Sequence, residues 1–98
     1  MAQVRWTQQA ANDLEAITDF IALDSPHYAS LFAMDVFASV ERLQAFPRLG
    51  RIVPELREPD IREIILGNYR IVDRIMGEAV DILTVWHGAR LLDPSHLA

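Results

Sequence analysis

Residues 61–87 read IREIILGNYRIVDRIMGEAVDILTVWH, and this stretch decides the fold. Three apolar runs rich in β-branched residues, at 61–66, 69–76 and 79–87, are separated by Gly67-Asn68 and Gly77-Glu78. A two-residue loop with glycine first is typical of a type II′ β-hairpin. The stretch therefore predicts a three-stranded antiparallel meander.

Loops of this length also fix which side chains share a face of the sheet. On one face we expect Glu63 and His87 to lie diagonal to Arg70, within reach of its long side chain. The other face, which carries Ile71 and Trp86, is the better candidate to receive the rest of the chain.

The same register places opposite charges directly across from one another. Arg62 lies opposite Asp73, and Arg74 lies opposite Asp81. We interpret both as cross-strand ion pairs that contribute a few tenths of a kcal/mol each, and not as part of a mechanism.

Upstream of the meander the apolar residues recur with a helical period. Gln3 to Trp6 alternates and can form a short strand, after which Thr7 offers a side-chain N-cap. Ser25 and Pro26 end this helix and begin a second one, which Phe46-Pro47 ends. So short a turn predicts two antiparallel helices.

The expected architecture is an α+β domain over residues 1–98, with a helical hairpin packed on an antiparallel sheet in the order β-α-α-β-β-β. Residues 47–60, with three prolines and one glycine, are expected to form a loop. With 98 residues, of which 51% are apolar, the chain fits a single core.

Composition excludes several classes of function. The absence of cysteine removes disulfides and thiol chemistry, and the three scattered histidines predict no metal site and no cofactor. No apolar run reaches the length of a membrane span, so we expect a cytoplasmic protein. The net charge of −5 argues against nonspecific nucleic-acid binding.

Glu63, Arg70 and His87 form the one set that could carry chemistry. A carboxylate and an imidazole could move protons while a guanidinium stabilised a phosphorane, which would suit metal-free RNA cleavage. A salt bridge between Glu63 and Arg70, with His87 capped by a backbone carbonyl, accounts for the same residues.

Several motifs in order resemble the RelE/ParE superfamily of type II toxins. They are AANDL at 10–14, Ser25-Pro26, Phe46-Pro47 with Gly50-Arg51, Val53-Pro54-Glu55, Ile61-Arg62-Glu63, GNYRI at 67–71 and VWHGAR at 85–90. The resemblance implies a small toxin neutralised by a cognate antitoxin, which lies in a groove between the helices and the sheet. RelE-like members cleave mRNA on the ribosome, whereas ParE-like members are linked to inhibition of DNA gyrase.

The chain looks more like the ParE branch, because it contains no lysine and its last tyrosine is Tyr69. This resemblance implies a toxin that binds a protein target, most readily gyrase, with no catalytic residue and no direct contact with DNA. The expected target-binding residues are Arg62, Tyr69, Arg70, His87 and Arg90. The expected antitoxin-binding residues are Leu14, Ile17, Ile21, Phe32, Val36 and Phe37.

Two alternatives stay open at this point. The first is a RelE-like mRNA endonuclease that uses Glu63, Arg70 and His87. The second is a relative that is no longer toxic and only binds its antitoxin, because a fold does not establish an activity.

Overall fold

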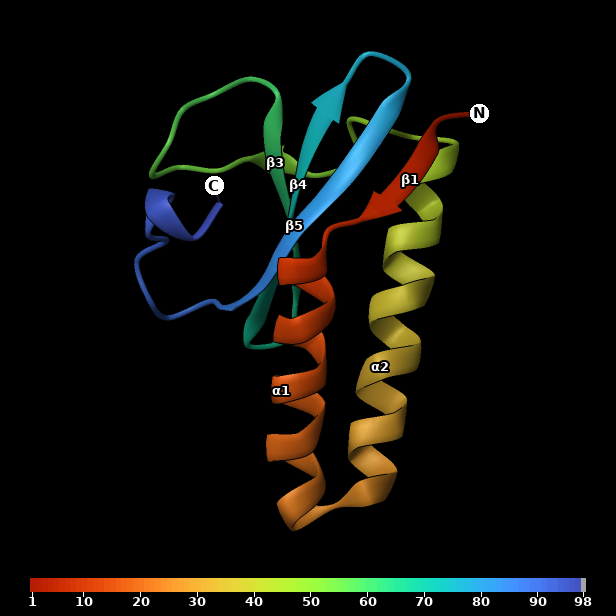
Figure 1. Ribbon diagram of the computed structural model, residues 1–98, viewed down its shortest axis with the longest axis vertical. Coiled ribbons are helices and arrows are strands. Elements are labelled where there is room, and N and C mark those ends of the chain that lie inside the picture. Colours follow the sequence, from red (N-terminus) through yellow and green to blue (C-terminus); the bar gives the residue numbers. More distant parts are fainter. Residues whose placement is uncertain (98) are drawn as a thin grey trace.

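In the computed structural model, which describes residues 1–97, two antiparallel helices pack on one face of a five-stranded mixed sheet (Figure 1). The strands lie in the order β1-β5-β4-β3-β2. The elements are β1 (Gln3–Trp6), α1 (Gln8–Asp24), α2 (Pro26–Glu41), the 3₁₀ turn η1 (Arg42–Gln44), β2 (Arg51–Ile52), β3 (Ile61–Leu66), β4 (Tyr69–Met76), β5 (Ala79–His87) and the 3₁₀ turn η2 (Pro94–Leu97). The predicted α+β architecture is confirmed.

Both predicted helix starts are capped as the sequence indicates. The Thr7 hydroxyl accepts a hydrogen bond from the backbone N–H of Ala10 at 3.1 Å. The Ser25 hydroxyl accepts from Tyr28 N–H at 3.2 Å, and Pro26 takes the first helical position. The helical hairpin then carries the chain from β1 at one edge of the sheet towards β2 at the other edge. Because β1 pairs parallel to β5, the sheet is mixed and not wholly antiparallel as predicted.

The meander has the predicted strand bounds. Gly67 and Gly77 adopt φ angles of +58° and +60°, as the first residue of a type II′ turn requires. The structure adds the short strand β2, which pairs with β3 inside the predicted loop. Two residues are too short to show a periodicity, so the sequence could not indicate this strand.

A β-bulge changes the predicted register in the second half of β5. Asp73 pairs with Ile82 as expected, but Val72 pairs with Thr84, so Leu83 is an extra residue on β5. One inserted residue moves every later side chain to the opposite face. Trp86 therefore shares a face with Arg70, and the prediction that Trp86 faces the helices was wrong.

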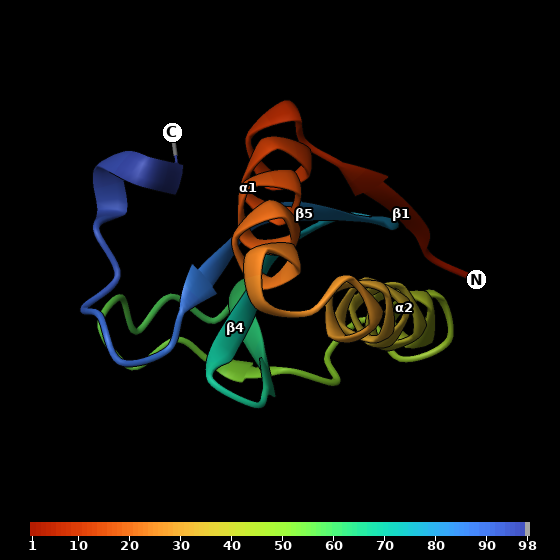
Figure 2. The same cartoon turned by 90° about the horizontal axis from the view of Figure 1, so that it is seen from below.

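The sheet is covered on both faces. The helices bury one cluster, which consists of Ala10, Leu14, Val36, Val40, Leu43, Ile71, Val80, Ile82 and Val85. On the other face Val53, Ile61, Val72, Leu83, Leu92 and Leu97 form a second cluster. Figure 2 shows the C-terminal segment, which supplies Leu92 and Leu97, on the side of the sheet away from α2.

Neither of the two cross-strand ion pairs that the register predicts, Arg62 with Asp73 and Arg74 with Asp81, is present among the described residues. Asp81 lies opposite Arg74 but pairs with Arg5 of β1, with Nε to Oδ1 at 2.6 Å. Arg62 donates to the carbonyls of Pro59 and Gly50 and leaves the Asp73 carboxylate, which is fully buried, without a hydrogen bond among the described residues. Arg5 thus replaces Arg74 as the partner of Asp81, whereas no hydrogen-bond donor of the described residues replaces Arg62 as the partner of Asp73.

Within residues 1–97, none of the helices has the length and apolar character needed to cross a membrane.

Candidate functional site

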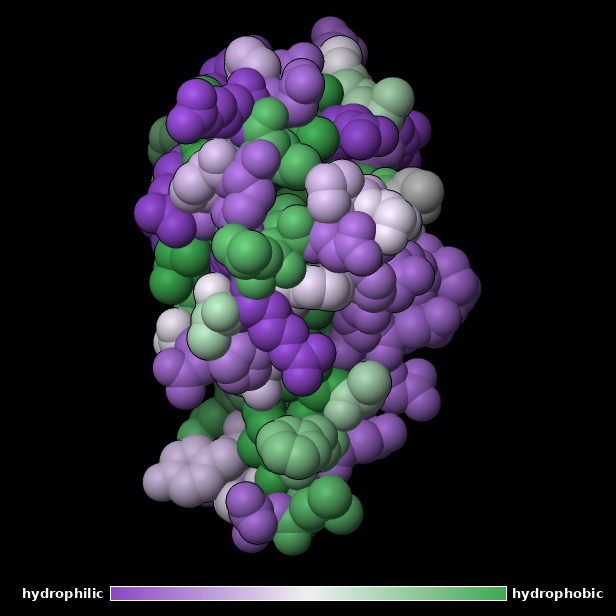
Figure 3. All heavy atoms as spheres, turned by 90° about the vertical axis from the view of Figure 1, so that its left-hand side faces the viewer, coloured by the Kyte–Doolittle hydropathy of each residue, from purple (hydrophilic) through white to green (hydrophobic). Residues whose placement is uncertain are grey.

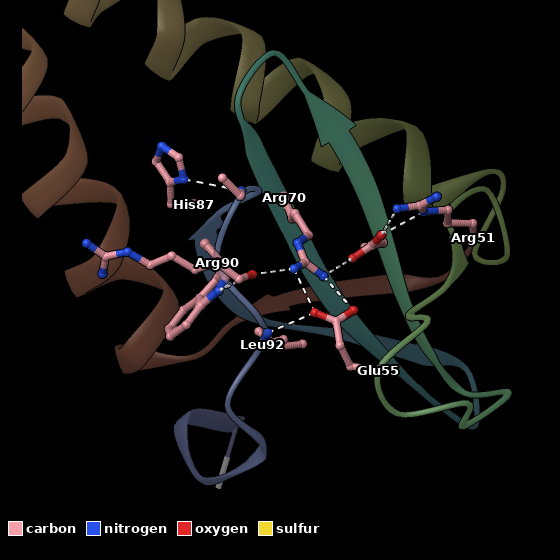
Figure 4. Close-up of polar contacts among 9 residues, drawn as sticks. Arg51, Glu55, Arg70, His87, Arg90 and Leu92 are labelled. Atoms are coloured by element: carbon pink, nitrogen blue, oxygen red, sulfur yellow. Dashed lines mark hydrogen bonds and ion pairs between the residues drawn. The ribbon is translucent and has the colours of Figure 1, made fainter.

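The site is built around Arg70 on β4, both of whose terminal guanidinium nitrogens donate hydrogen bonds (Figure 4). Its Nη1 and Nη2 donate to the two carboxylate oxygens of Glu55, at 2.9 and 2.7 Å. Nη1 also donates to Glu63 Oε1 at 3.1 Å, and Nη2 donates to the Arg90 carbonyl at 2.5 Å. Arg70 is only 6% exposed, so its guanidinium interacts with groups of the protein and not with solvent.

The network continues to the edge of the sheet. The carboxylate of Glu63 is fully buried, and its other oxygen accepts from Arg51 Nε at 2.7 Å. Arg70 donates to Glu55 and holds the pKa of that carboxyl down at about 2, and its hydrogen bonds to both glutamates raise the pKa of Arg70. Two arginines and two glutamates thus alternate and neutralise one another.

Residues 88–97, which we call the C-terminal strap, are fastened to this network. The backbone N–H of Leu92 donates to Glu55 Oε2 at 2.8 Å, next to the bond between Arg70 and the Arg90 carbonyl. Leu92 and Leu97 are buried in the second apolar cluster. The strap is therefore packed against the sheet, and Glu55 connects it to Arg70.

A second contact holds the end of the strap. His96 Nε2 lies 3.0 Å from Asp13 Oδ2 on α1, and the Thr84 hydroxyl donates to the same oxygen. The His96 ring also packs on Trp86, with centroids 4.7 Å apart. The strap thus bridges β5 and α1.

His87 does not join the site as predicted. The bulge pairs it with Tyr69, and their rings pack edge to face with centroids 5.5 Å apart. Its Nδ1 accepts from the Ala89 N–H at 3.2 Å, and Figure 4 shows the ring directed away from Arg70. Glu63 and Arg70 are therefore brought together as expected, whereas the expectation that His87 lies diagonal to Arg70 on the same face was wrong.

Two grooves meet at the end of β5. One, of about 580 Å³, runs past Arg51, Glu55 and Leu91. The other, of about 600 Å³, runs between α1 and the strap, past Phe20 and Trp86. Tyr69, His87 and Arg90 line both grooves.

The expected target-binding residues are thus divided among three places. Tyr69, His87 and Arg90 lie together at the meeting of the grooves. Arg70 is buried beneath them, and Arg62 is held by Pro59 and Gly50 and lines neither groove. The sequence did not indicate Glu55 and Leu92 as residues of the site. One lies in a loop and the other in the strap, and neither segment has a periodic pattern of side chains.

Among the expected antitoxin-binding residues, Leu14 and Val36 are buried in the core beneath the helices. Ile17 and Phe32 pack partly buried against that core. Phe37 is 53% exposed and packs on Trp6. Ile21 and Phe32 line a groove of about 420 Å³ between α2 and the turn that joins β3 to β4.

The helical hairpin carries exposed apolar residues that the helical stripes did not indicate. Phe20 and Leu23 are exposed on α1, and Tyr28, Leu31 and Met34 are exposed on α2. Figure 3 shows apolar side chains gathered over the end of the hairpin that projects beyond the sheet. Within the described residues, no group of three or more potential metal ligands is present.

Comparison with known proteins identifies the family to which the chain belongs. The family model for the ParE toxin of the type II toxin–antitoxin system parDE matches residues 4–92. This chain belongs to the ParE toxin family. It is accordingly a toxin component of a type II toxin–antitoxin system within the wider ParE/RelE group.

Two relatives of this ParE-family toxin are also named as toxins. It is 35% identical over 92 residues to Toxin RelE2 of Caulobacter vibrioides, covering 93% of this chain and 100% of that protein. It is 33% identical over 87 residues to the putative toxin Y4kP of Sinorhizobium fredii, covering 87% of this chain and 86% of that protein.

Two solved structures share the fold. The first, described as the chromosomal ParDE TA system from P. aeruginosa, matches at a TM-score of 0.73 and 29% identity, covering 89% of this chain and 96% of that one. The second, the toxin–antitoxin complex RelBE2 from Mycobacterium tuberculosis, matches at 0.57 and 25%, covering 88% and 96%.

Proposed function

We propose that this toxin arrests growth by binding a protein target, DNA gyrase, and that a cognate antitoxin neutralises it. The observation that carries the proposal is the state of Arg70, which two carboxylates and one carbonyl already satisfy. To hold a phosphate, this guanidinium would have to leave two ion pairs in a site that is 6% exposed. A target-binding toxin makes no such demand on Arg70.

The placement of charge supports a protein target as well. The whole chain carries a net charge of −5, and α1 and α2 contain six carboxylates and no arginine or lysine. Nucleic acids are bound through clusters of cations that displace counterions. An acidic toxin of this kind is better suited to a protein surface, and we place its action in the cytoplasm.

The antitoxin surface follows from the same charges. The two structural neighbours are toxin–antitoxin systems, which supports an antitoxin partner for this chain. We assign that partner to the groove lined by Ile21, Leu31 and Phe32 and to the exposed Met34 of α2. Because both helices are acidic, an amphipathic antitoxin segment with basic residues at its rim would complement them.

The deciding experiment is a DNA supercoiling assay with purified gyrase and the antitoxin-free toxin. The expected result is inhibition that disappears when the antitoxin is added back. Folded toxin that arrests growth but leaves supercoiling unchanged would overturn the assignment of gyrase.

One observation favours a second candidate, a ribosome-dependent mRNA endonuclease. A relative at 35% identity is named RelE2. On this reading, His87→Ala abolishes mRNA cleavage in a protein that still folds and binds its antitoxin. Cleavage of ribosome-bound mRNA by the wild type, with no effect on supercoiling, would favour this candidate over gyrase.

A further inference from the structure

We propose that this toxin binds its target through the side chains of Arg90 and Leu91, and that the binding site on the target is an apolar pocket bordered by carboxylates. The proposal rests on the proposed action on a protein target and names the surface that performs it. It assigns Arg70 and Glu55 a positioning role, because they fix the backbone on either side of the pair.

The backbone of the pair is pinned at both ends. The Arg90 carbonyl accepts from Arg70 Nη2 at 2.5 Å, and the Leu92 N–H donates to Glu55 Oε2 at 2.8 Å. Arg70 and Glu55 are themselves joined by two hydrogen bonds. A surface loop held in this way loses little conformational entropy when a partner binds, which favours affinity.

The side chains of the pair nevertheless point outward. Leu91 is 83% exposed, between a carbonyl and an N–H that are both fastened to the protein. Figure 4 shows the Arg90 side chain extending away from the Glu55 carboxylate that fastens the strap. Arginine is enriched among residues that dominate binding energy at protein interfaces, and an exposed leucine beside it supplies apolar area.

Among residues 1–97, Arg90 also has no ion-pair partner. Arg51 and Arg70 are balanced by Glu55 and Glu63, with which they form ion pairs. For Arg90, no carboxylate of residues 1–97 lies within ion-pair distance. Since Arg90 lines both grooves, a carboxylate of a partner seated at their meeting point would find an unpaired guanidinium.

The surroundings favour a protein over a nucleic acid as the occupant. Ile65 is 51% exposed in the first groove and Phe20 is 68% exposed in the second, so apolar area flanks Leu91 and Arg90 on both sides. A strand of RNA would require a track of cations along its phosphates, whereas the arginines neighbouring Arg90 are already paired with glutamates. Binding of RNA through Arg90 is the competing outcome of the test.

The test expresses Arg90→Ala, Arg90→Lys and Leu91→Ala in cells without the antitoxin and measures growth arrest. Matched controls are Arg42→Ala, an exposed arginine at the far end of α2, and Met76→Ala, a half-exposed residue at the opposite end of the sheet. We expect Arg90→Ala and Leu91→Ala to need at least tenfold more toxin for the same arrest, Arg90→Lys to retain most of the activity, and both controls to match the wild type. Thermal unfolding and antitoxin binding should be unchanged in all five.

The outcomes separate this proposal from the choice of target. Wild-type growth arrest without gyrase inhibition would reject gyrase, while the loss in Arg90→Ala and Leu91→Ala would still support the contact pair. Full toxicity in both variants would overturn the contact pair whatever the target is. RNA binding by the purified wild type and Arg90→Ala is measured in parallel, and its loss in Arg90→Ala, with Leu91→Ala fully toxic, would overturn the protein partner and favour a nucleic acid.

Discussion

The carboxylate of Glu55 receives both terminal nitrogens of Arg70, at 2.9 and 2.7 Å, and one of its oxygens also accepts the N–H of Leu92. A residue of the loop after β2 thus joins the centre of the sheet to the C-terminal strap. Paired, planar contacts between a guanidinium and a carboxylate are among the stronger charge-assisted hydrogen bonds. Because Arg70 is buried and the Glu55 side chain is only 20% exposed, loss of this pair should lower the stability of the fold.

Arg70→Ala should lower the free energy of unfolding by about 3–5 kcal/mol, because it leaves Glu63 buried without its guanidinium partner and frees the strap. Arg5→Ala is the control, since it removes an arginine from a pair in which Arg5 is half exposed, and should cost at most about 1 kcal/mol. Urea unfolding of the three proteins measures the difference. Equal losses in the two variants would show that the Arg70 network does not stabilise the fold.

The same network should make the protein sensitive to acid. The pKa of Glu55 is lowered to about 2 in the folded protein, chiefly by the hydrogen bonds from Arg70, while the unfolded value is 4.5. A depressed carboxyl pKa contributes stability that is present above the unfolded value and is lost as the pH falls through the folded value. Urea midpoints should therefore drop between pH 5 and pH 2, and Glu55→Gln should reduce that drop. An equally steep drop in Glu55→Gln would assign the acid sensitivity to other groups.

Two residues of α2 that lie two positions apart should respond in opposite ways. Val36 is fully buried in the core, so Val36→Ala should cost about 1–3 kcal/mol of stability. Met34 is 65% exposed, so Met34→Ala should leave stability within about 0.5 kcal/mol but weaken antitoxin binding. Thermal unfolding and titration with the antitoxin separate the two effects. Unchanged antitoxin affinity in Met34→Ala would exclude the outer face of α2 from the complex.

The meander could be predicted because its information is local. Gly67 and Gly77 take the positive φ angles that the loops require, and the pairing next to each turn follows from loop length alone. The faces near the end of β5 could not be predicted in the same way. The segment from Ile82 to Trp86 is apolar almost throughout, so the sequence does not say which side chains face the helices, and the bulge after Ile82 reverses them.

The strap illustrates a second limit. Its residues show no periodicity, and it is fixed by Glu55 and Asp13, which lie 37 residues before Leu92 and 83 residues before His96. The contact between Glu63 and Arg70 could be predicted from the strand register. The contact between Glu55 and Arg70 could not, because it depends on how a proline-rich loop folds back over the sheet. Contacts between distant irregular segments leave no pattern in the sequence.

Asp73 is the other titratable group with a marked shift, and its environment is the reverse of that of Glu55. Both carboxylate oxygens are buried and have no hydrogen-bond partner among the described residues. Burial raises the pKa of this carboxyl from 3.8 to about 7, and the nearby charge of Arg62 offsets only part of that effect. Charged Asp73 is thus disfavoured in the folded protein.

The stability should accordingly fall as the pH rises from about 4 to about 7, because over this range the unfolded chain releases the Asp73 proton and the folded protein retains it. Above about pH 7 both states are ionised and the contribution becomes constant. Asp73→Asn stays neutral at every pH, so it should remove this slope and be more stable than the wild type at pH 8 by on the order of 1–4 kcal/mol. Urea unfolding of both proteins at pH 5, 6, 7 and 8 measures the slope, with Asp81→Asn as the control, since Asp81 pairs with the exposed Arg5. A wild-type slope that persists in Asp73→Asn would place the titrating group elsewhere.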